Sequence, residues 1–540
     1  MQLTPNPSAA GRSAPLWREW RWSYLPPLMV YLAAGIQGLT GIVGTFFVKE
    51  YLDLSAEFLA ALGFWLGIPW ALKMPIGHLV DVVWRQKAWL VVFGASLITA
   101  SLLIMAALIG ARDTMAALWS VNGWFVLSAL LAPIGYVVQD AVADAMTAEA
   151  VPRVDNDGTP LPPERIRAMH VTMQTLGRVA LIGGTVLVAM INLVVFADAG
   201  SLSASEKVAT YRNVYLMALA IPVVSVLGIA LQAWLQRQQL RGHLARGLSL
   251  AQARALMEPN PVATAPNAWI LGGSLVFVVF TVSVGLSGWS YSQELIFIGS
   301  LAIVGFLMLR LVNQLSEAAR RTLLGTALVV FMFRATPGTG AGVSWWSIDV
   351  LGFDQAFFSV LSLVASCLTL VGMLVFRRFM AERSIFYITG WLTLAGFLLA
   401  LPNLGMSLGL HEWTAARTNG VVDARFIALI DTALESPLGQ ISMIPLLAWI
   451  ANAAPAHLKA TYFAVMTSFA NLALSAGQLG TKYLNQWFVI TREVRDPNGV
   501  ISVAANYSEL PALLATAIGL GLLLPLAAIA VAMARGWRSA

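Results

Sequence analysis

Two aspartates, Asp140 and Asp144, stand four residues apart inside a long apolar stretch of the sequence. Residues at this spacing share one face of a helix. Two facing carboxylates repel each other unless they bind a cation, pair with a base or hold a proton. Arg178 lies about twelve residues into the next apolar stretch and is the expected partner of these acids. The residue types therefore predict a site for protons or a charged substrate, and the alternative is a structural ion pair.

A second acidic pair occurs late in the chain. Asp431 and Glu435 have the same spacing, and Gln440 follows them. These residues occupy the fourth apolar stretch of the second half, the position that matches Asp140 and Asp144 in the first half. Matching acidic pairs in equivalent segments predict that both halves of the chain contribute to one central chamber.

Arg334 is the mid-span base of the second half and is followed by Thr336 and the run PGTGAG. Proline and three glycines are expected to break this helix and to free backbone groups. A membrane tolerates unwound backbone only where protein or a wet cavity satisfies those groups. The segment is therefore a candidate for substrate contact, and the alternative is a simple hinge.

Lys73 lies on the second apolar stretch and is expected to form a salt-bridge gate with an acid of the fourth. Its alternative is a long side chain that reaches the membrane surface. Gln37 is expected to add a neutral hydrogen bond to the chamber, although such residues also join helices within membranes.

The composition is that of a multi-pass membrane protein. Hydrophobic residues make up 58% of the 540 residues and charged residues 11%, whereas soluble domains carry about 25% charged residues. The mean hydropathy is +0.74. The net charge of +6 reflects Lys and Arg that fall mainly in loops on one side of the membrane, roughly 20 against 8, which favours two cytoplasmic termini in a bacterial inner membrane. The lipid bilayer is the expected surrounding, and no nucleic-acid partner is expected.

Apolar segments of roughly 20 residues can cross a bilayer as helices. We predict an all-α protein with about fourteen transmembrane helices, near residues 25–48, 56–80, 88–110, 116–146, 167–196, 211–236, 268–287, 291–313, 322–350, 354–377, 384–402, 423–452, 457–488 and 509–534.

The linkers divide these segments into six, two and six, as in a major facilitator fold with an added hairpin. The predicted parts are an N-terminal six-helix half at 1–236, a cytoplasmic connector with an inserted two-helix hairpin at 237–321, and a C-terminal six-helix half at 322–540. The hairpin is expected to be peripheral, and its turn is expected at Gly288.

The segment that follows the second apolar stretch, GHLVDVVWRQK at 77–87, resembles the G-x-L-x-D-x-x-G-R-R/K loop of major facilitator transporters. Gly77 would allow close helix approach, Asp81 would cap a helix or pair with a cation, and Arg85 and Lys87 would hold the loop in the cytoplasm. This resemblance assigns the four residues a role in gating.

Several patches in both halves resemble the folate–biopterin transporter family and occur in the same order. They are PWALKMP at 69–75, DAVADA at 140–145, FMFRATP at 331–337 with LGF at 351–353, MIPL at 443–446 and FAVMTSFAN at 463–471. The resemblance implies a folate- or pterin-like substrate. Together with the protonatable acids, it predicts a secondary active transporter that imports an organic anion with protons by alternating access, as a monomer.

Two alternatives remain open from the sequence. One is a muropeptide-type permease for amphiphilic anions, and the other is a non-transporting assembly factor for pigment complexes with the same fold. An enzyme is not expected, because the five histidines are scattered and the sequence contains no phosphate loop or nucleophile elbow. No cofactor and no metal are expected.

Overall fold

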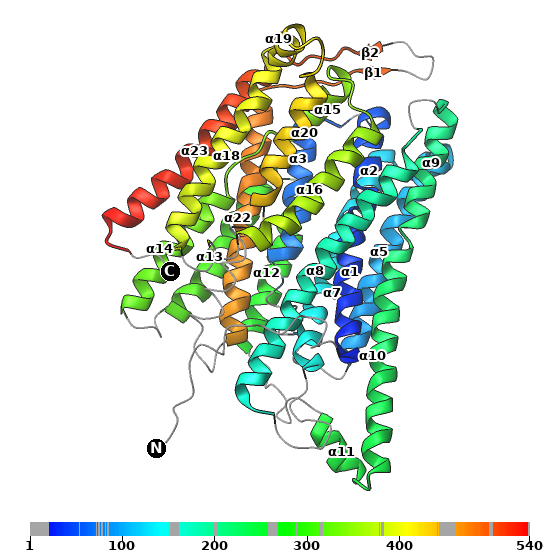
Figure 1. Cartoon of the computed structure of the whole chain (residues 1–540), viewed down its shortest axis with the longest axis vertical. Coiled ribbons are helices and arrows are strands. Elements are labelled where there is room, and N and C mark those ends of the chain that lie inside the picture. The colour runs from blue at the N-terminus through cyan, green and yellow to red at the C-terminus, as the bar shows by residue number, and fades with distance from the viewer. Residues whose placement is uncertain are drawn as a thin grey trace, which may run out of the picture.

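The computed structural model describes residues 21–537, except 53, 72, 74–75, 77–78, 81–82, 84–85, 152–160, 199–201, 258–267, 288, 313–316, 377–378, 380–382, 440, 442–458 and 496–500. The described residues form a bundle of long helices that run along a common direction (Figure 1). Helix α1 begins and helix α23 ends toward the same end of the bundle. The predicted all-α architecture is confirmed.

The N-terminal part of the bundle packs mainly around α1 and α5. Helix α1 contacts α7, α8 and α10, and α5 contacts α7, α9 and α10. The elements are η3 (Trp22–Tyr24), α1 (Leu25–Ile36), η4 (Gln37–Thr40), α2 (Gly41–Tyr51), α3 (Ala56–Ala71), α5 (Lys87–Gly110), α6 (Arg112–Leu118), α7 (Val121–Ala150), α8 (Pro163–Val195), α9 (Ala204–Met217), α10 (Ala220–Ala245) and α11 (Leu250–Met257).

The remaining helices form a second group, in which α14 and α18 pack on α23 and α16 packs on α20. Its elements are α12 (Ala268–Leu286), α13 (Ser292–Val312), α14 (Glu317–Arg334), α15 (Gly342–Asp349), α16 (Gln355–Val375), α18 (Ile385–Ser407), α19 (Leu410–Arg417), α20 (Ala424–Glu435), η7 (Ser436–Leu438), α22 (Lys459–Trp487) and α23 (Leu510–Ala534). The most extensive contacts between the groups are those of α3 with α22 and of α8 with α16, and α2 also contacts α16.

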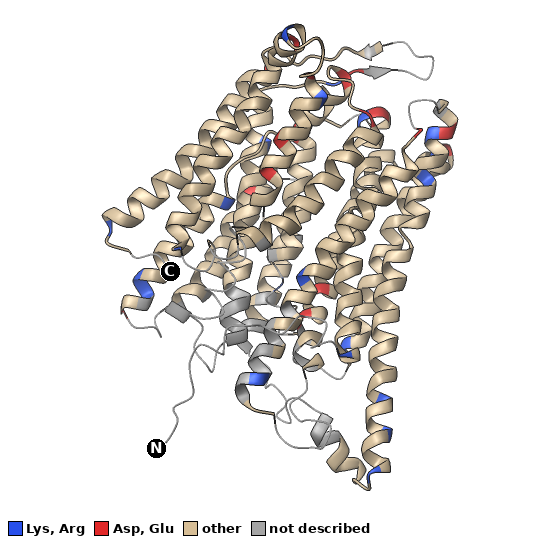
Figure 2. Ribbon diagram, viewed as in Figure 1, with Lys and Arg blue, Asp and Glu red and all other residues tan. Residues whose placement is uncertain are grey.

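Charged residues gather toward the two ends of the bundle, and few lie between them (Figure 2). Eight helical stretches in the described part are long and apolar enough to cross a membrane, and three shorter apolar helices accompany them. The chain is therefore an integral multi-pass membrane protein. The predicted total of about fourteen spans, like the proposed boundaries at residues 236 and 321, stays a prediction.

Local signals start the two helices that carry the acidic pairs. The Ser120 hydroxyl accepts the Gly123 N–H at 3.1 Å and caps α7. The Asp423 carboxylate accepts the Phe426 N–H at 2.8 Å and caps α20. Such caps satisfy backbone donors that lack a partner within the helix. They fix where each helix begins and thereby the depth of its acidic residues.

Two features depart from uniform membrane helices. The predicted break after Arg334 is confirmed, because α14 ends there and the chain resumes as α15 at Gly342. Gly340 adopts φ +72°, a conformation that favours glycine. A small antiparallel sheet, β1 (Val494–Arg495) with β2 (Ile501–Val503), lies between α22 and α23 and was not predicted.

The inserted hairpin turns between Leu286 and Ser292, as predicted, and contacts one helix of each group. The Gln293 amide donates to the Ala61 carbonyl of α3 at 3.0 Å. The Glu294 carboxylate pairs with Lys482 of α22 at 3.0 Å. The hairpin is therefore held by one polar contact to α3 and one to α22.

Glycine lets α1 and α8 approach with their backbones in contact. A Cβ atom added at Gly35 would lie 2.0 Å from the Leu181 carbonyl oxygen of α8. We expect Gly35→Ala to separate these helices at a cost of about 1–3 kcal/mol, the usual range for overpacking. The melting temperature in detergent should fall by several degrees.

The matched control for this change is Gly38→Ala. That glycine lies one turn further along the same segment, and an added Cβ meets nothing within 4 Å. An unchanged melting temperature for Gly35→Ala would show that the contact between α1 and α8 is looser than the structure indicates.

Candidate functional site

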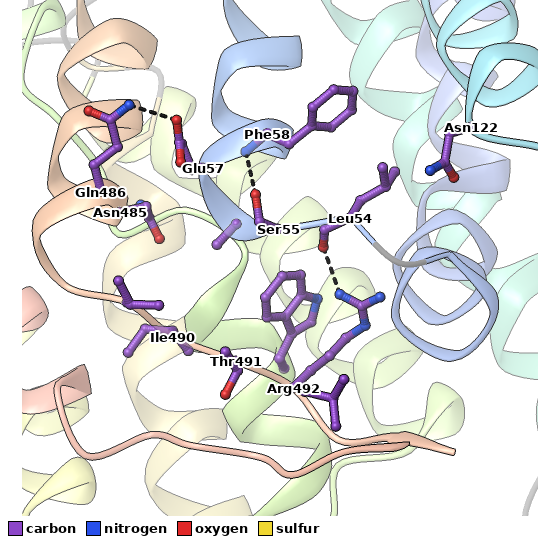
Figure 3. Close-up of a pocket in the computed structure, with 14 residues that line it drawn as sticks. Leu54, Ser55, Glu57, Phe58, Asn122, Asn485, Gln486, Ile490, Thr491 and Arg492 are labelled. Carbon is purple, nitrogen blue, oxygen red and sulfur yellow. Dashed lines mark hydrogen bonds between the residues drawn. The ribbon is translucent and has the colours of Figure 1, made fainter. Parts of the chain in front are cut away.

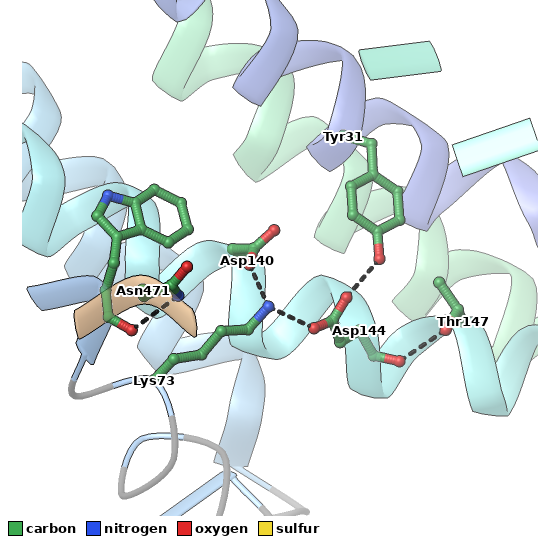
Figure 4. A network of polar contacts seen from close by, with 7 residues as sticks. Tyr31, Lys73, Asp140, Asp144, Thr147 and Asn471 are labelled. Atoms are coloured by element: carbon green, nitrogen blue, oxygen red, sulfur yellow. Dashed lines mark hydrogen bonds and ion pairs between the residues drawn. The ribbon is translucent and has the colours of Figure 1, made fainter. Parts of the chain in front are cut away.

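The two aspartates of α7 share one lysine. Lys73 Nζ lies 2.5 Å from Asp140 Oδ2 and 2.7 Å from Asp144 Oδ2. Figure 4 shows the ammonium group between the two carboxylates. Lys73 lies just past Ala71, the last residue of α3, and α3 packs on α7. One cation between two anions leaves a net charge of −1 when all three groups are ionised, so one added proton would make the cluster neutral.

Tyr31 completes this cluster from α1. Its hydroxyl donates to Asp144 Oδ1 at 2.6 Å (Figure 4). Lys73 and Tyr31 thus occupy different oxygens of Asp144, which holds that side chain in one orientation. Sequence reasoning missed Tyr31, because a single tyrosine within an apolar helix is equally typical of simple packing.

The predicted pairing of Arg178 with Asp140 or Asp144 needs correction. Arg178 is exposed on α8, and no ion pair within the described residues joins it to either aspartate. It is still close enough to interact electrostatically with both. The physical reason is packing, because α3 lies against α7 more extensively than α8 does and brings Lys73 to the acids.

The acidic pair of the second half has a different environment. Asp431 is buried, with 7% of its surface exposed, and accepts the Asn403 amide of α18 at 2.7 Å. Its other oxygen, Oδ1, is buried without a hydrogen-bond partner in the described part of the chain. Glu435 is exposed on the same helix, and Gln440 lies outside the described residues. Asp431 thus has an amide partner, whereas Asp140 and Asp144 have a cation.

Arg334 ends α14 at the start of the unwound segment and contacts α22. Its Nε donates to the Ala470 carbonyl at 3.1 Å. The Thr336 hydroxyl turns back and donates to the Phe333 carbonyl at 3.1 Å, which satisfies one acceptor of the last helical turn. The break thus keeps a guanidinium group and unwound backbone next to each other.

Helix α22 supplies partners for the unwound backbone. The Thr481 hydroxyl accepts the Gly338 N–H at 2.8 Å, and the Asn485 amide donates to the Thr339 carbonyl at 3.3 Å. Gly477 allows the approach, since a Cβ atom there would lie 3.1 Å from the Thr336 carbonyl oxygen. The requirement that freed backbone groups be satisfied within a membrane is met by this face of α22.

The remaining predicted residues lie elsewhere or outside the described part. Gly77, Asp81 and Arg85 of the loop motif are outside the described residues, whereas Lys87 is the buried first residue of α5. Gln37 begins the short 3₁₀ segment η4 between α1 and α2 and is exposed. The gating role of the loop stays a prediction.

Polar contacts join helices at the end of the bundle opposite to the Asp140 cluster. Lys49 of α2 forms an ion pair with Asp349 of α15, which also accepts the Tyr507 hydroxyl. Burial and this hydrogen bond raise the pKa of Tyr507, which keeps it protonated as a donor. Gln355 of α16 donates to the buried Tyr211 hydroxyl of α9 at 2.7 Å. These contacts join the two helix groups.

Arg492, which follows α22, strengthens the same end. It is 4% exposed and donates to three backbone carbonyls where α2 ends, those of Lys49, Leu52 and Leu54. Cations at a helix C-terminus satisfy acceptors that lack a partner within the helix. A residue of the second helix group thus caps a helix of the first.

A pocket of about 710 Å³ lies beside these contacts (Figure 3). Its polar lining includes Glu57, Asn122, Gln486 and Arg492, and the Gln486 amide donates to Glu57 at 2.6 Å. None of the predicted site residues lines it. The expectation that acids and bases of both halves surround one chamber therefore stays a prediction.

Comparison with known proteins agrees with the family resemblance predicted from the sequence. Residues 275–536 match the BT1 family. A folate–biopterin transporter of Synechocystis sp. is 24% identical over 498 residues, which cover 91% of this chain and 80% of that relative. Both matches support the predicted resemblance to the folate–biopterin transporter family. The Synechocystis relative is named as a transporter and not as an enzyme, which supports membrane transport as the role of this chain.

Solved structures support the predicted fold of this chain. A mutant of the peptide transporter POT superposes with a TM-score of 0.58 at 16% identity and covers 96% of this chain and 94% of its own. A POT family transporter in complex with 5-aminolevulinic acid has a TM-score of 0.57 at 11% identity, and the match covers 95% of each chain. A mutant of the nucleoside transporter NupG has a TM-score of 0.51 at 11% identity, and the match covers 96% of this chain and 99% of NupG. The predicted major facilitator fold is confirmed.

Proposed function

We propose that this protein is a proton-coupled importer of a folate- or pterin-like organic anion and works by alternating access. The BT1 family match, the named relative and the fold support membrane transport. The substrate class follows the name of the Synechocystis relative. The proposal also includes a monomeric protein of the bacterial inner membrane, with both termini in the cytoplasm.

The cluster of Lys73, Asp140 and Asp144 is the observation that carries proton coupling. One ammonium lies within 2.7 Å of two carboxylates. The three ionised groups together carry a net charge of −1, which suits the uptake of one proton. The neutral cluster that results is the form that an apolar environment favours. Asp431 supports a second proton position, since its buried Oδ1 has no hydrogen-bond partner in the described part of the chain.

The Arg334 guanidinium group, at the break in the helix, is the proposed contact for the anion. A guanidinium group binds carboxylates through two parallel hydrogen bonds. Moving an anion into an inside-negative cell costs about 2.3 kcal/mol per charge for each 100 mV. Symported protons offset this cost, and Asp140, Asp144 and Asp431 are the proposed carriers.

Polar contacts at one end of the bundle support alternating access. The Lys49–Asp349 ion pair and the Arg492 cap join both helix groups at the end away from Asp140. With the orientation proposed from the basic loops, this end faces the outside, and the proposed route to the substrate then opens toward the cytoplasm.

Uptake by the purified protein in proteoliposomes tests the proposal. Tritiated folate and a tritiated pterin should accumulate when the exterior is at pH 5.5 and the lumen at pH 7.5, and a protonophore should abolish accumulation. Labelled muropeptide is the comparison substrate. Accumulation of muropeptide alone would replace the substrate proposal. If no compound accumulates and the protein co-purifies with a pigment complex, the assembly role would hold instead.

A further inference from the structure

Helix α22 contacts the first helix group with one face and the unwound segment of the second group with another. Toward α3, Ser475 and Gln478 lie against the glycines of that helix. A Cβ atom at Gly67 would be 3.0 Å from the Ser475 hydroxyl, and one at Gly63 would be 2.7 Å from Gln478 Oε1. Small residues of this kind let membrane helices approach closely. The α3–α22 contact is therefore tight.

One hydrogen bond crosses this contact near the acidic cluster. The Asn471 amide of α22 donates to the Trp70 carbonyl of α3 at 3.2 Å. Trp70 precedes Lys73 by three residues, which is about one helical turn. Figure 4 shows Asn471 near the Lys73 side chain, with its own hydrogen bond to the backbone of α3.

The position of Lys73 depends on such contacts. Pro69 and Pro75 flank Trp70 and Lys73 in the sequence. Pro69 lies inside α3 and lacks a backbone N–H, so it removes a hydrogen bond from that helix. Because Pro69 weakens the last turns of α3, the Asn471 side chain restrains the end of the helix that precedes Lys73.

The neighbouring residue of α22 contacts the other predicted site. The Ala470 carbonyl accepts Arg334 Nε at 3.1 Å. Ala470 and Asn471 are consecutive, so a displacement of Arg334 that pulls on the Ala470 carbonyl also moves the peptide that carries Asn471. The two contacts form a continuous connection from Arg334 through α22 to α3.

We propose that Asn471 is a positioning residue that couples the Arg334 site of the second half to the Lys73–Asp140–Asp144 cluster of the first. The inference rests on the proposed function, because it assigns the route by which anion binding influences the proton site. Among the described residues, the titratable and charged groups around the aspartates are Tyr31 of α1, Lys73 beyond α3 and Arg178 of α8.

The test compares two transport modes in proteoliposomes that contain the full-length protein. Exchange of tritiated folate for unlabelled folate needs no net proton movement, whereas accumulation under a pH gradient does. We expect Asn471→Leu to keep exchange within about threefold of the wild-type rate and to lower accumulation at least about tenfold, a typical strength of coupling between sites. Asn471→Gln keeps an amide donor and should recover much of the accumulation.

Ser475→Ala is the matched control, because Ser475 lies one turn along the same α3-facing side of α22 and no described hydrogen bond joins it to α3. It should behave as the wild type. The inference is overturned if Asn471→Leu accumulates folate normally, or if exchange and accumulation fall by the same factor. If the wild type itself fails to accumulate folate, the proposed function is wrong and the coupling role falls with it.

Discussion

Replacing Lys73 by methionine is expected to abolish proton-driven uptake and to destabilise the protein. The change removes the ammonium group that lies 2.5 Å from Asp140 and 2.7 Å from Asp144. The side chains of Lys73 and Asp140 are only 21% and 16% exposed. Removing one partner of a buried ion pair costs about 3–5 kcal/mol.

The two carboxylates of this variant can avoid repulsion by holding a proton permanently. A proton that does not leave cannot be delivered to the cytoplasm, so accumulation of tritiated folate under a pH gradient should fall at least about 100-fold, equivalent to about 2.7 kcal/mol. The melting temperature should also fall. Both quantities are measured on the same preparation, by uptake in proteoliposomes and by thermal unfolding in detergent.

A second variant separates stability from coupling. Lys73→Met combined with Asp144→Asn leaves one carboxylate and should recover most of the lost melting temperature, yet not the uptake. Lys482→Met is the matched single control, because Lys482 pairs with Glu294 at 3.0 Å away from the cluster. It should lower stability while leaving pH-driven accumulation in place. Near-normal accumulation by Lys73→Met would eliminate the cluster as the proton site.

The acidic cluster shows how far the sequence could lead. The four-residue spacing of Asp140 and Asp144 predicts a shared helix face, and the structure places both carboxylates on one lysine. The sequence named both Lys73 and Arg178 as bases for these acids, and the Lys73 pairing is the one that the structure contains. Spacing alone could not choose between them. The choice depends on how α3 and α8 pack against α7, and tertiary packing is not encoded in the period of a single helix.

The break after Arg334 was predictable for the opposite reason. Proline and glycine act on the local backbone, so PGTGAG indicates an interruption wherever the segment packs. The partners of the break could not be foreseen. Thr481 and Asn485 lie about 145 residues further along the chain, and each is equally consistent with simple helix–helix contact.

The docked hairpin is an intermediate case. Its two apolar segments and their turn follow from hydropathy, whereas the contacts of Gln293 with α3 and of Glu294 with α22 do not. Lys482 near the end of a span is typical of a side chain that reaches the membrane surface. In the structure it is 9% exposed and meets Glu294 instead, because the inserted hairpin supplies an acid at the same depth.

Replacing Arg334 by leucine is expected to weaken binding of carboxylated substrates while sparing uncharged ones. A hydrogen bond to a charged group contributes about 1.5–3 kcal/mol, which corresponds to a loss of about 10-fold to 150-fold in affinity. Folate carries carboxylates beyond its pterin ring, and a simple pterin does not. The Kd for tritiated folate should therefore rise within this range, and the Kd for the pterin should change less than about threefold.

The comparison between two ligands makes this prediction specific, because a general loss of folding would weaken both equally. Arg334→Lys keeps the charge without the planar fork and should give an intermediate Kd for folate. The matched control is Arg425→Leu. Arg425 also donates to a backbone carbonyl of the second half, that of Gly352 at 3.0 Å, yet it lies near the end opposite to the Asp140 cluster and is exposed. Equal losses for folate and pterin in Arg334→Leu would indicate that Arg334 holds α14 on α22 through the Ala470 carbonyl and does not contact the anion.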